Sequence, residues 1–80
     1  MTKAAELAAV ARGEGCLGRS QDDEPVFILC ARDRVAAETV RDWVVRADGI
    51  GVRQRKLREA LDLADSMDVW RREHGGKTPD

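Results

Sequence analysis

The sequence predicts a mostly α-helical fold, with an N-terminal helix, one short strand and then an antiparallel helical hairpin. Three observations support this expectation. Apolar residues recur at three- and four-residue steps through most of the second half of the chain, which is the period of a buried helix face. Glycines separate the candidate helices from one another. A single run of five apolar residues follows Pro25, so an α+β fold stays open.

The length and composition indicate one small folded domain over residues 1–80. The chain is 42% hydrophobic and 36% charged, which is typical of globular proteins and not of disordered ones. A chain of 80 residues buries a smaller share of its surface than a larger protein does, so its stability is marginal. We therefore expect a homo-oligomer, in which a second copy covers apolar surface that one copy leaves exposed.

The N-terminal part of the chain predicts a short helix followed by a loop. Thr2 can cap a helix within residues 1–12, because its hydroxyl can accept a hydrogen bond from a free amide of the first turn. This helix is rich in alanine, and Leu7 and Val10 are its only bulky apolar residues, so it is marginal alone. Residues 13–24 contain three glycines and a polar cluster, which predicts a loop.

The apolar run at residues 26–30 is the candidate strand. Its five consecutive residues are rich in β-formers, which favours a short strand that is buried on both faces. A helix stays open as the alternative, because Pro25 also suits the first helical position behind acidic residues. Since no second strand is evident in the chain, we expect the strand to pair with that of a second copy.

The second half of the chain predicts two helices that form an antiparallel hairpin. Asp33 is expected to cap the first, which runs to about residue 48, and the second covers residues 52–73. The short connection at residues 49–51 brings the helices side by side. Residues 25–74 form the predicted core and residues 75–80 a flexible tail. The two facing stripes are Ala36, Val40, Trp43, Val44 and Ala47, and Leu57, Ala60, Leu61, Ala64 and Met67.

No motif of an enzyme or a metal site stands out, so we predict a non-enzymatic protein without metal or cofactor. The sequence lacks a serine–histidine–acid set, a Walker-type phosphate loop and an HExxH motif. Cys16 and Cys30 stand alone, without the paired spacing of a zinc site. The glycines of residues 13–18 match GxGxxG, but no strand precedes them. A magnesium-dependent enzyme stays open because Asp22 and its acidic neighbours at 23–24 could hold the ion.

The charge order of the second hairpin helix is the most informative feature of the sequence. Basic residues crowd its N-terminal end, and carboxylates follow. Because helix N-termini already carry partial positive charge, this order costs stability unless an anion or an acidic partner is bound there. The end could hold an anionic ligand, or two copies of the helix could pack antiparallel. A solvated face with a pair between Arg58 and Asp62 is the third interpretation.

Arginine and tryptophan are the residue types that would hold an anionic nucleotide. Eleven of the 14 basic residues are arginine, whose guanidinium can bind a phosphate through two hydrogen bonds. Tryptophan can stack on a purine, although one of the two also fits the predicted core. The predicted ligand-binding residues are Arg32, Arg34, Trp43, Arg53, Arg55, Lys56, Arg58 and Trp70.

The overall charge and the hydropathy pattern narrow the choice of partner and compartment. A net charge of -1 gives no general attraction to nucleic acids or anionic lipids, so we expect no non-specific nucleic-acid binding. No apolar run approaches the roughly 20 residues of a membrane span, so no membrane partner is expected. Glu6 stands where a signal peptide needs apolar residues. We therefore expect a cytoplasmic protein.

Several segments between residues 13 and 70 also resemble known sequences. They are Cys16-Leu17-Gly18-Arg19, Asp23-Glu24-Pro25-Val26-Phe27-Ile28-Leu29 and Ala31-Arg32-Asp33, continuing through Trp43 and Ala60-Leu61 to Trp70. On these residues the chain resembles a family of small bacterial and phage proteins without an assigned activity. Small phage proteins of this size include counter-defence factors, among them oligomeric sponges that sequester nucleotide immune signals. That analogy is one of size and setting, and neither fixes a function.

Three functional hypotheses follow. The first is a non-enzymatic homo-oligomeric binding protein, of phage or prophage origin, that sequesters a small anionic nucleotide signal as an anti-defence sponge. The second is a protein-interaction module that inhibits or adapts a host protein, which predicts an exposed apolar patch without a basic pocket. The third is a small metal-dependent enzyme that cleaves a nucleotide.

Overall fold

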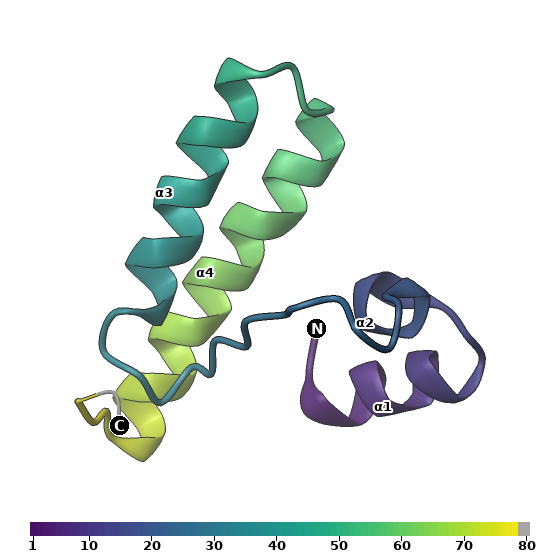
Figure 1. Ribbon diagram of the computed structural model, residues 1–80. Helices are drawn as coiled ribbons and strands as arrows, with labels where there is room; N and C mark the ends of the chain where they lie inside the picture. The colour runs from purple at the N-terminus through teal and green to yellow at the C-terminus, as the bar shows by residue number, and fades with distance from the viewer. Residues whose placement is uncertain (79–80) are drawn as a thin grey trace.

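The computed structural model describes residues 1–78, which form two helical units joined by an extended connection (Figure 1). In the first unit α1 packs on α2, and in the second α3 and α4 form a long antiparallel hairpin. Within residues 1–78, no helix of one unit packs on a helix of the other. The described residues form the helices α1 (Lys3–Ala11), α2 (Gly15–Arg19), α3 (Ala36–Gly49) and α4 (Gln54–His74).

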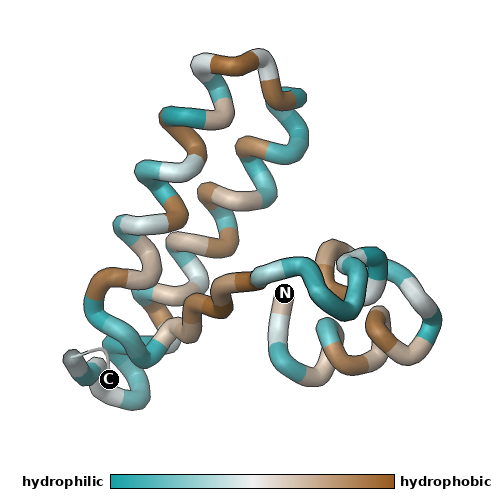
Figure 2. Tube along the Cα trace, viewed as in Figure 1, coloured by the Kyte–Doolittle hydropathy of each residue, from teal (hydrophilic) through white to brown (hydrophobic). Residues whose placement is uncertain are grey.

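The core of the protein lies between α3 and α4, where apolar positions recur along the facing sides of the two helices (Figure 2). Ala36 and Ala64 are fully buried there, and small side chains at a helix contact let the two backbones approach closely. The mostly helical fold and the hairpin therefore match the prediction. The buried residues are Ala36, Ala37, Ala64 and Met67 in one cluster, and Val44, Ala47 and Leu57 in the other.

Two details of α3 differ from the prediction. Asp33 does not cap the helix: Val35 occupies the N-cap position, and no side chain accepts a hydrogen bond there. Instead, the hydroxyl of Thr39, within the helix, donates a hydrogen bond to the backbone carbonyl of Val35, four residues earlier, at 2.7 Å. Trp43 was expected in the core but is 44% exposed, because it lies at the flank of the stripe that faces α4.

The first unit contains a helix where a loop was predicted. Residues 15–19 form α2, and the Ser20 hydroxyl donates to the Cys16 carbonyl at 2.8 Å. Gly18 allows α2 to lie against α1, since a Cβ on Gly18 would come within 3.3 Å of Val10 Cα. Thr2 caps α1 as predicted, accepting from an amide of the first turn at 3.1 Å. Neither helix contains a buried residue.

The segment at residues 26–30 is neither strand nor helix in the described chain. The alternative of a helix is therefore wrong, and the predicted strand lacks a partner within residues 1–78. Because the strand was expected to pair with a second copy, that pairing stays a prediction. Leu29 and Ala31 pack against the first core cluster, and these contacts anchor the end of the segment to the hairpin.

The chain beyond α4 returns to the hairpin. The Lys77 amide donates to the Arg32 carbonyl at 2.8 Å, and the Arg34 amide donates to the Lys77 carbonyl at 3.0 Å. This bridge differs from the loose tail predicted for residues 75–80, of which 79 and 80 lie outside the described residues. None of the described helices combines the length and the apolar character that crossing a membrane requires.

Candidate functional site

The structure does not bring the eight predicted ligand-binding residues together. Arg32 and Arg34 precede α3, at the end of the hairpin where α4 finishes. The four basic residues at 53–58 lie at the opposite end, where α4 begins. Because α4 has 21 residues, these ends are about 30 Å apart at 1.5 Å per residue. Within one copy, the two groups cannot contact the same small ligand.

The basic end of α4 is open to solvent. Arg55 forms an ion pair with Glu59 at 3.5 Å, and the predicted pair between Arg58 and Asp62 is not formed. No side chain caps the helix. The side-chain amide of Gln54, the first helical residue, donates a hydrogen bond to the Asp48 carboxylate at 3.1 Å. The side chains of Arg53, Lys56 and Arg58 have no hydrogen-bond or ion-pair partner among residues 1–78.

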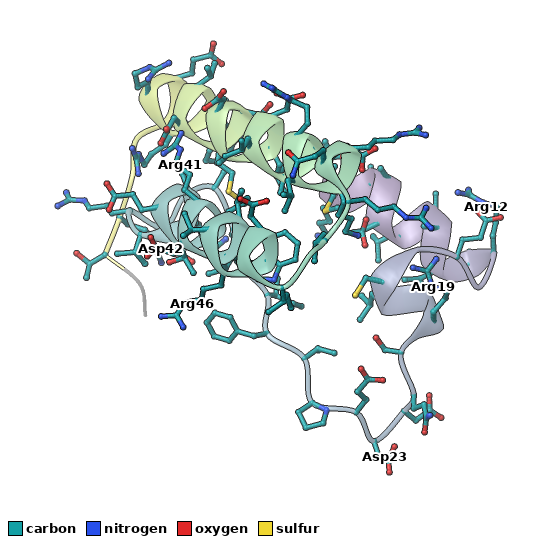
Figure 3. The ribbon with its side chains drawn as sticks, turned by 90° about the horizontal axis from the view of Figure 1, so that it is seen from above. Arg12, Arg19, Asp23, Arg41, Asp42 and Arg46 are labelled. Carbon is teal, nitrogen blue, oxygen red and sulfur yellow. The ribbon has the colours of Figure 1, made fainter. Side chains whose placement is uncertain are left out.

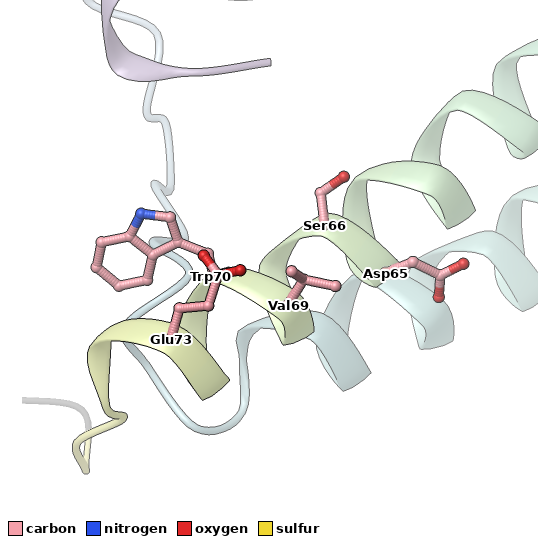
Figure 4. A pocket seen from close by; sticks show the side chains of 5 residues that line it. All are labelled: Asp65, Ser66, Val69, Trp70 and Glu73. Carbon is pink, nitrogen blue, oxygen red and sulfur yellow. The ribbon is translucent and has the colours of Figure 1, made fainter.

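Trp70 lines a shallow hollow at the other end of α4, of about 370 Å³ (Figure 4). Its indole stacks on the His74 ring, with centroids 4.1 Å apart and planes within 9°. Two of the other lining residues, Asp65 and Glu73, are carboxylates, and no basic side chain lines the hollow. The hollow therefore brings Trp70 together with carboxylates and with none of the predicted ligand-binding arginines.

Arg41 was not among the predicted functional residues, yet it is the centre of the main ion-pair network. It reaches from α3 to α4 (Figure 3) and donates to Asp65 at 3.0 Å and to Asp68 at 2.6 Å. Arg71 donates to the same Asp68 carboxylate at 3.0 Å and to the Arg34 carbonyl at 2.9 Å. These groups are occupied in joining α3 to α4 and are not a ligand site.

The network also shifts two pKa values. The hydrogen bond from Arg41 lowers the pKa of Asp68 against the opposing effect of burial, and the charges of Arg41 and Arg71 add to that lowering. The hydrogen bonds to Asp68 and Asp65 raise the pKa of Arg41. The sequence contains an indication of this network, because Arg41 lies beside the apolar stripe of the first predicted hairpin helix, and Asp65 and Asp68 lie beside that of the second.

The described residues contain no arrangement that would bind a metal ion. Within residues 1–78, no three histidine, cysteine or acidic side chains lie close enough together to hold one. Asp22 and its acidic neighbours are exposed, and Asp23 projects from the connection away from both helical units (Figure 3). Cys16 and Cys30 are free thiols, the first exposed and the second half-buried.

The most unusual surface is the connection between the two units. Val26, Phe27 and Ile28 are 53%, 84% and 69% exposed, although the sequence predicted burial on both faces. The backbone N–H and C=O groups of residues 26–29 make no hydrogen bond within the described chain. This exposed segment, residues 26–28, has large apolar side chains and free backbone groups in one stretch. It is the candidate functional site.

Comparisons were made with protein-family models, with curated proteins and with solved structures, and none of the three yields a match.

Proposed function

We propose that the chain is a non-enzymatic protein-interaction module that binds through the exposed segment. The observation that supports this proposal is three consecutive large apolar side chains on the surface of a small protein. Isolated exposed apolar residues are ordinary, whereas contiguous ones mark interaction surfaces. Burying such a side chain is worth about 1.5–3 kcal/mol, so a partner that covered all three would gain substantially.

The free backbone groups indicate how a partner would bind. An extended segment with unpaired N–H and C=O groups can add to a strand of another chain, which satisfies those groups and gives affinity. Apolar pockets for alternate side chains then give specificity. This mode of binding requires no catalytic group. We place it in a reducing compartment such as the cytoplasm, where the two free thiols persist.

A small anionic nucleotide is the second candidate partner, as in a phage anti-defence sponge. Its support is the basic end of α4, where Arg53, Lys56 and Arg58 have no partner in the described chain. Isothermal titration with cyclic and ADP-ribose-type nucleotides tests it. Binding that is lost in the double variant Arg53→Ala, Arg58→Ala would support this candidate, and the absence of binding heat would remove it.

A photocrosslinking amino acid in place of Phe27 tests the proposed function directly. The full chain with this group at position 27 is produced in bacterial cells and irradiated, and adducts are identified by mass spectrometry. The matched control has the same group at Val45, which is 72% exposed on α3. We expect protein adducts at position 27 well above those at position 45. Equal labelling at both positions would refute an interaction surface at the exposed segment.

A further inference from the structure

We infer that the partner of residues 26–30 is the same stretch of a second copy, paired antiparallel about Ile28. This inference rests on the proposed function and names its partner. The two chains would form a two-stranded sheet that crosses a twofold axis at Ile28. The structure supplies the extended, unpaired backbone, and the opposite charges on either side of it favour a second copy in the antiparallel orientation.

The charges that flank the segment are complementary to those of a second copy. Acidic residues occupy positions 22–24 on its N-terminal side, and Arg32 and Arg34 lie on its C-terminal side. In an antiparallel pair centred on Ile28, facing positions lie equally far from Ile28 on opposite sides. The ladder itself covers residues 26–30, and its antiparallel direction brings the acidic turn at residues 22–24 of one copy beside Arg32 and Arg34 of the second copy. The twofold axis repeats this contact, so that opposite charges lie together at both ends of the paired segment.

The alternative arrangement of the same two segments is unfavourable. In a parallel, in-register pair, the acidic turns of the two copies would lie together at one end of the ladder, and the arginines of both copies would lie together at the other end. Like charges directly opposite one another destabilise a strand pair, and opposite charges stabilise it. The charge pattern thus selects the antiparallel arrangement.

The side chains that would form these pairs are available. Asp22, Arg32 and Arg34 are exposed or near the surface, and their side chains have no hydrogen-bond or ion-pair partner within residues 1–78. Glu24 accepts one hydrogen bond, from the Gln21 amide at 3.2 Å, and keeps a second carboxylate oxygen for an arginine. No existing ion pair has to break for the two copies to associate.

The antiparallel register also covers a highly exposed apolar side chain. Phe27, which is 84% exposed, would face Leu29 of the second copy. Leu29 already packs against the core cluster between α3 and α4, so Phe27 of one copy would extend the apolar core of the other. On the opposite face, Ile28 would meet its own copy at the twofold axis, with Val26 facing Cys30 of the second copy.

The chain limits the pairing to residues 26–30. Pro25 has no N–H and cannot donate to a ladder, so it ends the segment on one side. On the other side, the Asp33 amide donates to the Cys30 carbonyl at 3.0 Å, which turns the chain toward α3. Two short strands are marginal alone, but here each is anchored to a helical hairpin through Leu29 and Ala31.

Cysteine crosslinking tests the register. In the full chain with Cys16→Ser and Cys30→Ser, the variant Ile28→Cys places its thiol opposite its own copy. Facing Cα atoms are about 4.5–5.5 Å apart, within the range that a disulfide spans. Val26→Cys in the same background is the matched control, because the two thiols would lie roughly 13 Å apart along the strands. A third variant has Cys16→Ser and Val26→Cys but keeps Cys30, so that the thiol at position 26 of one copy faces the Cys30 thiol of the second copy.

We expect mild oxidation to give a covalent dimer with Ile28→Cys and with Val26→Cys plus Cys30, but not with Val26→Cys alone. Equal crosslinking of all three variants would overturn the register. If none crosslinks while position 27 still labels a different protein, the proposed function stands and this inference falls. If position 27 also labels nothing above its control, both fail.

Charge reversal provides an independent test that leaves the apolar segment unchanged. Glu24→Arg and Arg32→Glu should each weaken the dimer by about three- to tenfold, since each disrupts two symmetry-related pairs. The double variant restores opposite charges across the axis and should bring the dissociation constant back to within about twofold of the wild type. The dimer is measured by sedimentation equilibrium. Single and double variants that all match the wild type would contradict the inference.

Discussion

At the scale of single residues, Arg41 and Asp68 show how this small protein joins its two long helices. The guanidinium of Arg41 lies between two carboxylates of α4, and the Asp68 side chain is 21% exposed against 74% for Asp65. Hydrogen bonds that involve two charged groups are shorter and stronger than neutral ones. The pair with Asp68 is therefore the part of the network that stabilises the hairpin most.

The lowered pKa of Asp68 predicts how stability depends on pH. Because the folded pKa is below the unfolded value of about 3.9, the stabilisation is complete above that pH and is lost as the pH falls through the folded pKa. We expect Asp68→Asn to lower the melting temperature at pH 7 and the difference from wild type to shrink below about pH 4.

The matched control for this prediction is Asp62→Asn, because the Asp62 carboxylate has no partner among the described residues. Its melting temperature should follow the wild type at every pH. Thermal unfolding followed by circular dichroism measures all three proteins. A constant difference between wild type and Asp68→Asn down to pH 2 would show that the carboxylate contributes nothing through its charge.

The alanine contacts between α3 and α4 make a second prediction at this scale. Ala64 is fully buried beside Ala36 and Ala37, so there is no room for a larger side chain. Ala64→Leu should lower the free energy of unfolding by about 1–3 kcal/mol, the usual cost of overpacking a core. Ala8→Leu on the exposed face of α1 should change it by less than about 0.5 kcal/mol. Urea unfolding provides the comparison.

At the scale of helices, the two units differ in what holds them together. The α3–α4 hairpin has two buried apolar clusters, whereas α1 and α2 bury no residue completely. Isolated helices of fewer than about 12 residues are marginal in water, and α1 and α2 have nine and five. The N-terminal unit should therefore open independently of the hairpin.

Hydrogen exchange tests this difference. We expect the amides of α1 and α2 to exchange nearly as fast as those of an unstructured peptide, and the central amides of α3 and α4 to be strongly protected. Mass spectrometry of peptic peptides resolves the two units. Equal protection across both would mean that contacts between the units, or with a second copy, stabilise the N-terminal helices.

The helices could be predicted to the extent that their sequence pattern is local. The apolar stripes of α3 and α4 pack against each other and can be recognised from their spacing alone. The sequence therefore predicts both helices to within a few residues of their observed ends. The helix α2 was missed because its glycines predict a loop, whereas Gly18 serves a contact with α1 that no local pattern contains. Its residue type favours Asp33 as a cap, but the backbone there bridges to Lys77.

The candidate site could be predicted only in part. The apolar composition of residues 26–30 indicates that they are covered by something, but composition does not say by what. The structure shows that the rest of the chain leaves residues 26–28 exposed, which composition could not predict. Residue type alone places the basic residues in one group, although an antiparallel hairpin already implies that Arg32 and Arg58 lie at opposite ends.

At the scale of the whole molecule, an exposed apolar segment joins two units whose helices do not pack on each other. A chain this short gains stability when a second copy covers apolar surface. The flanking charges favour an antiparallel arrangement in which the segment itself supplies that cover. In the pairing that we propose, the protein is one half of an assembly whose interface is the connection between its helical units.

Sedimentation equilibrium of the full chain over a range of concentrations would reveal such a dimer, with Ile28→Asp and Val45→Asp as the matched variants. We expect a wild-type dimer, a monomeric Ile28→Asp whose helical circular dichroism is unchanged, and a Val45→Asp that still dimerises. A wild type that remains monomeric at its highest soluble concentration would contradict this expectation, and so would an Ile28→Asp that dimerises as strongly as the wild type.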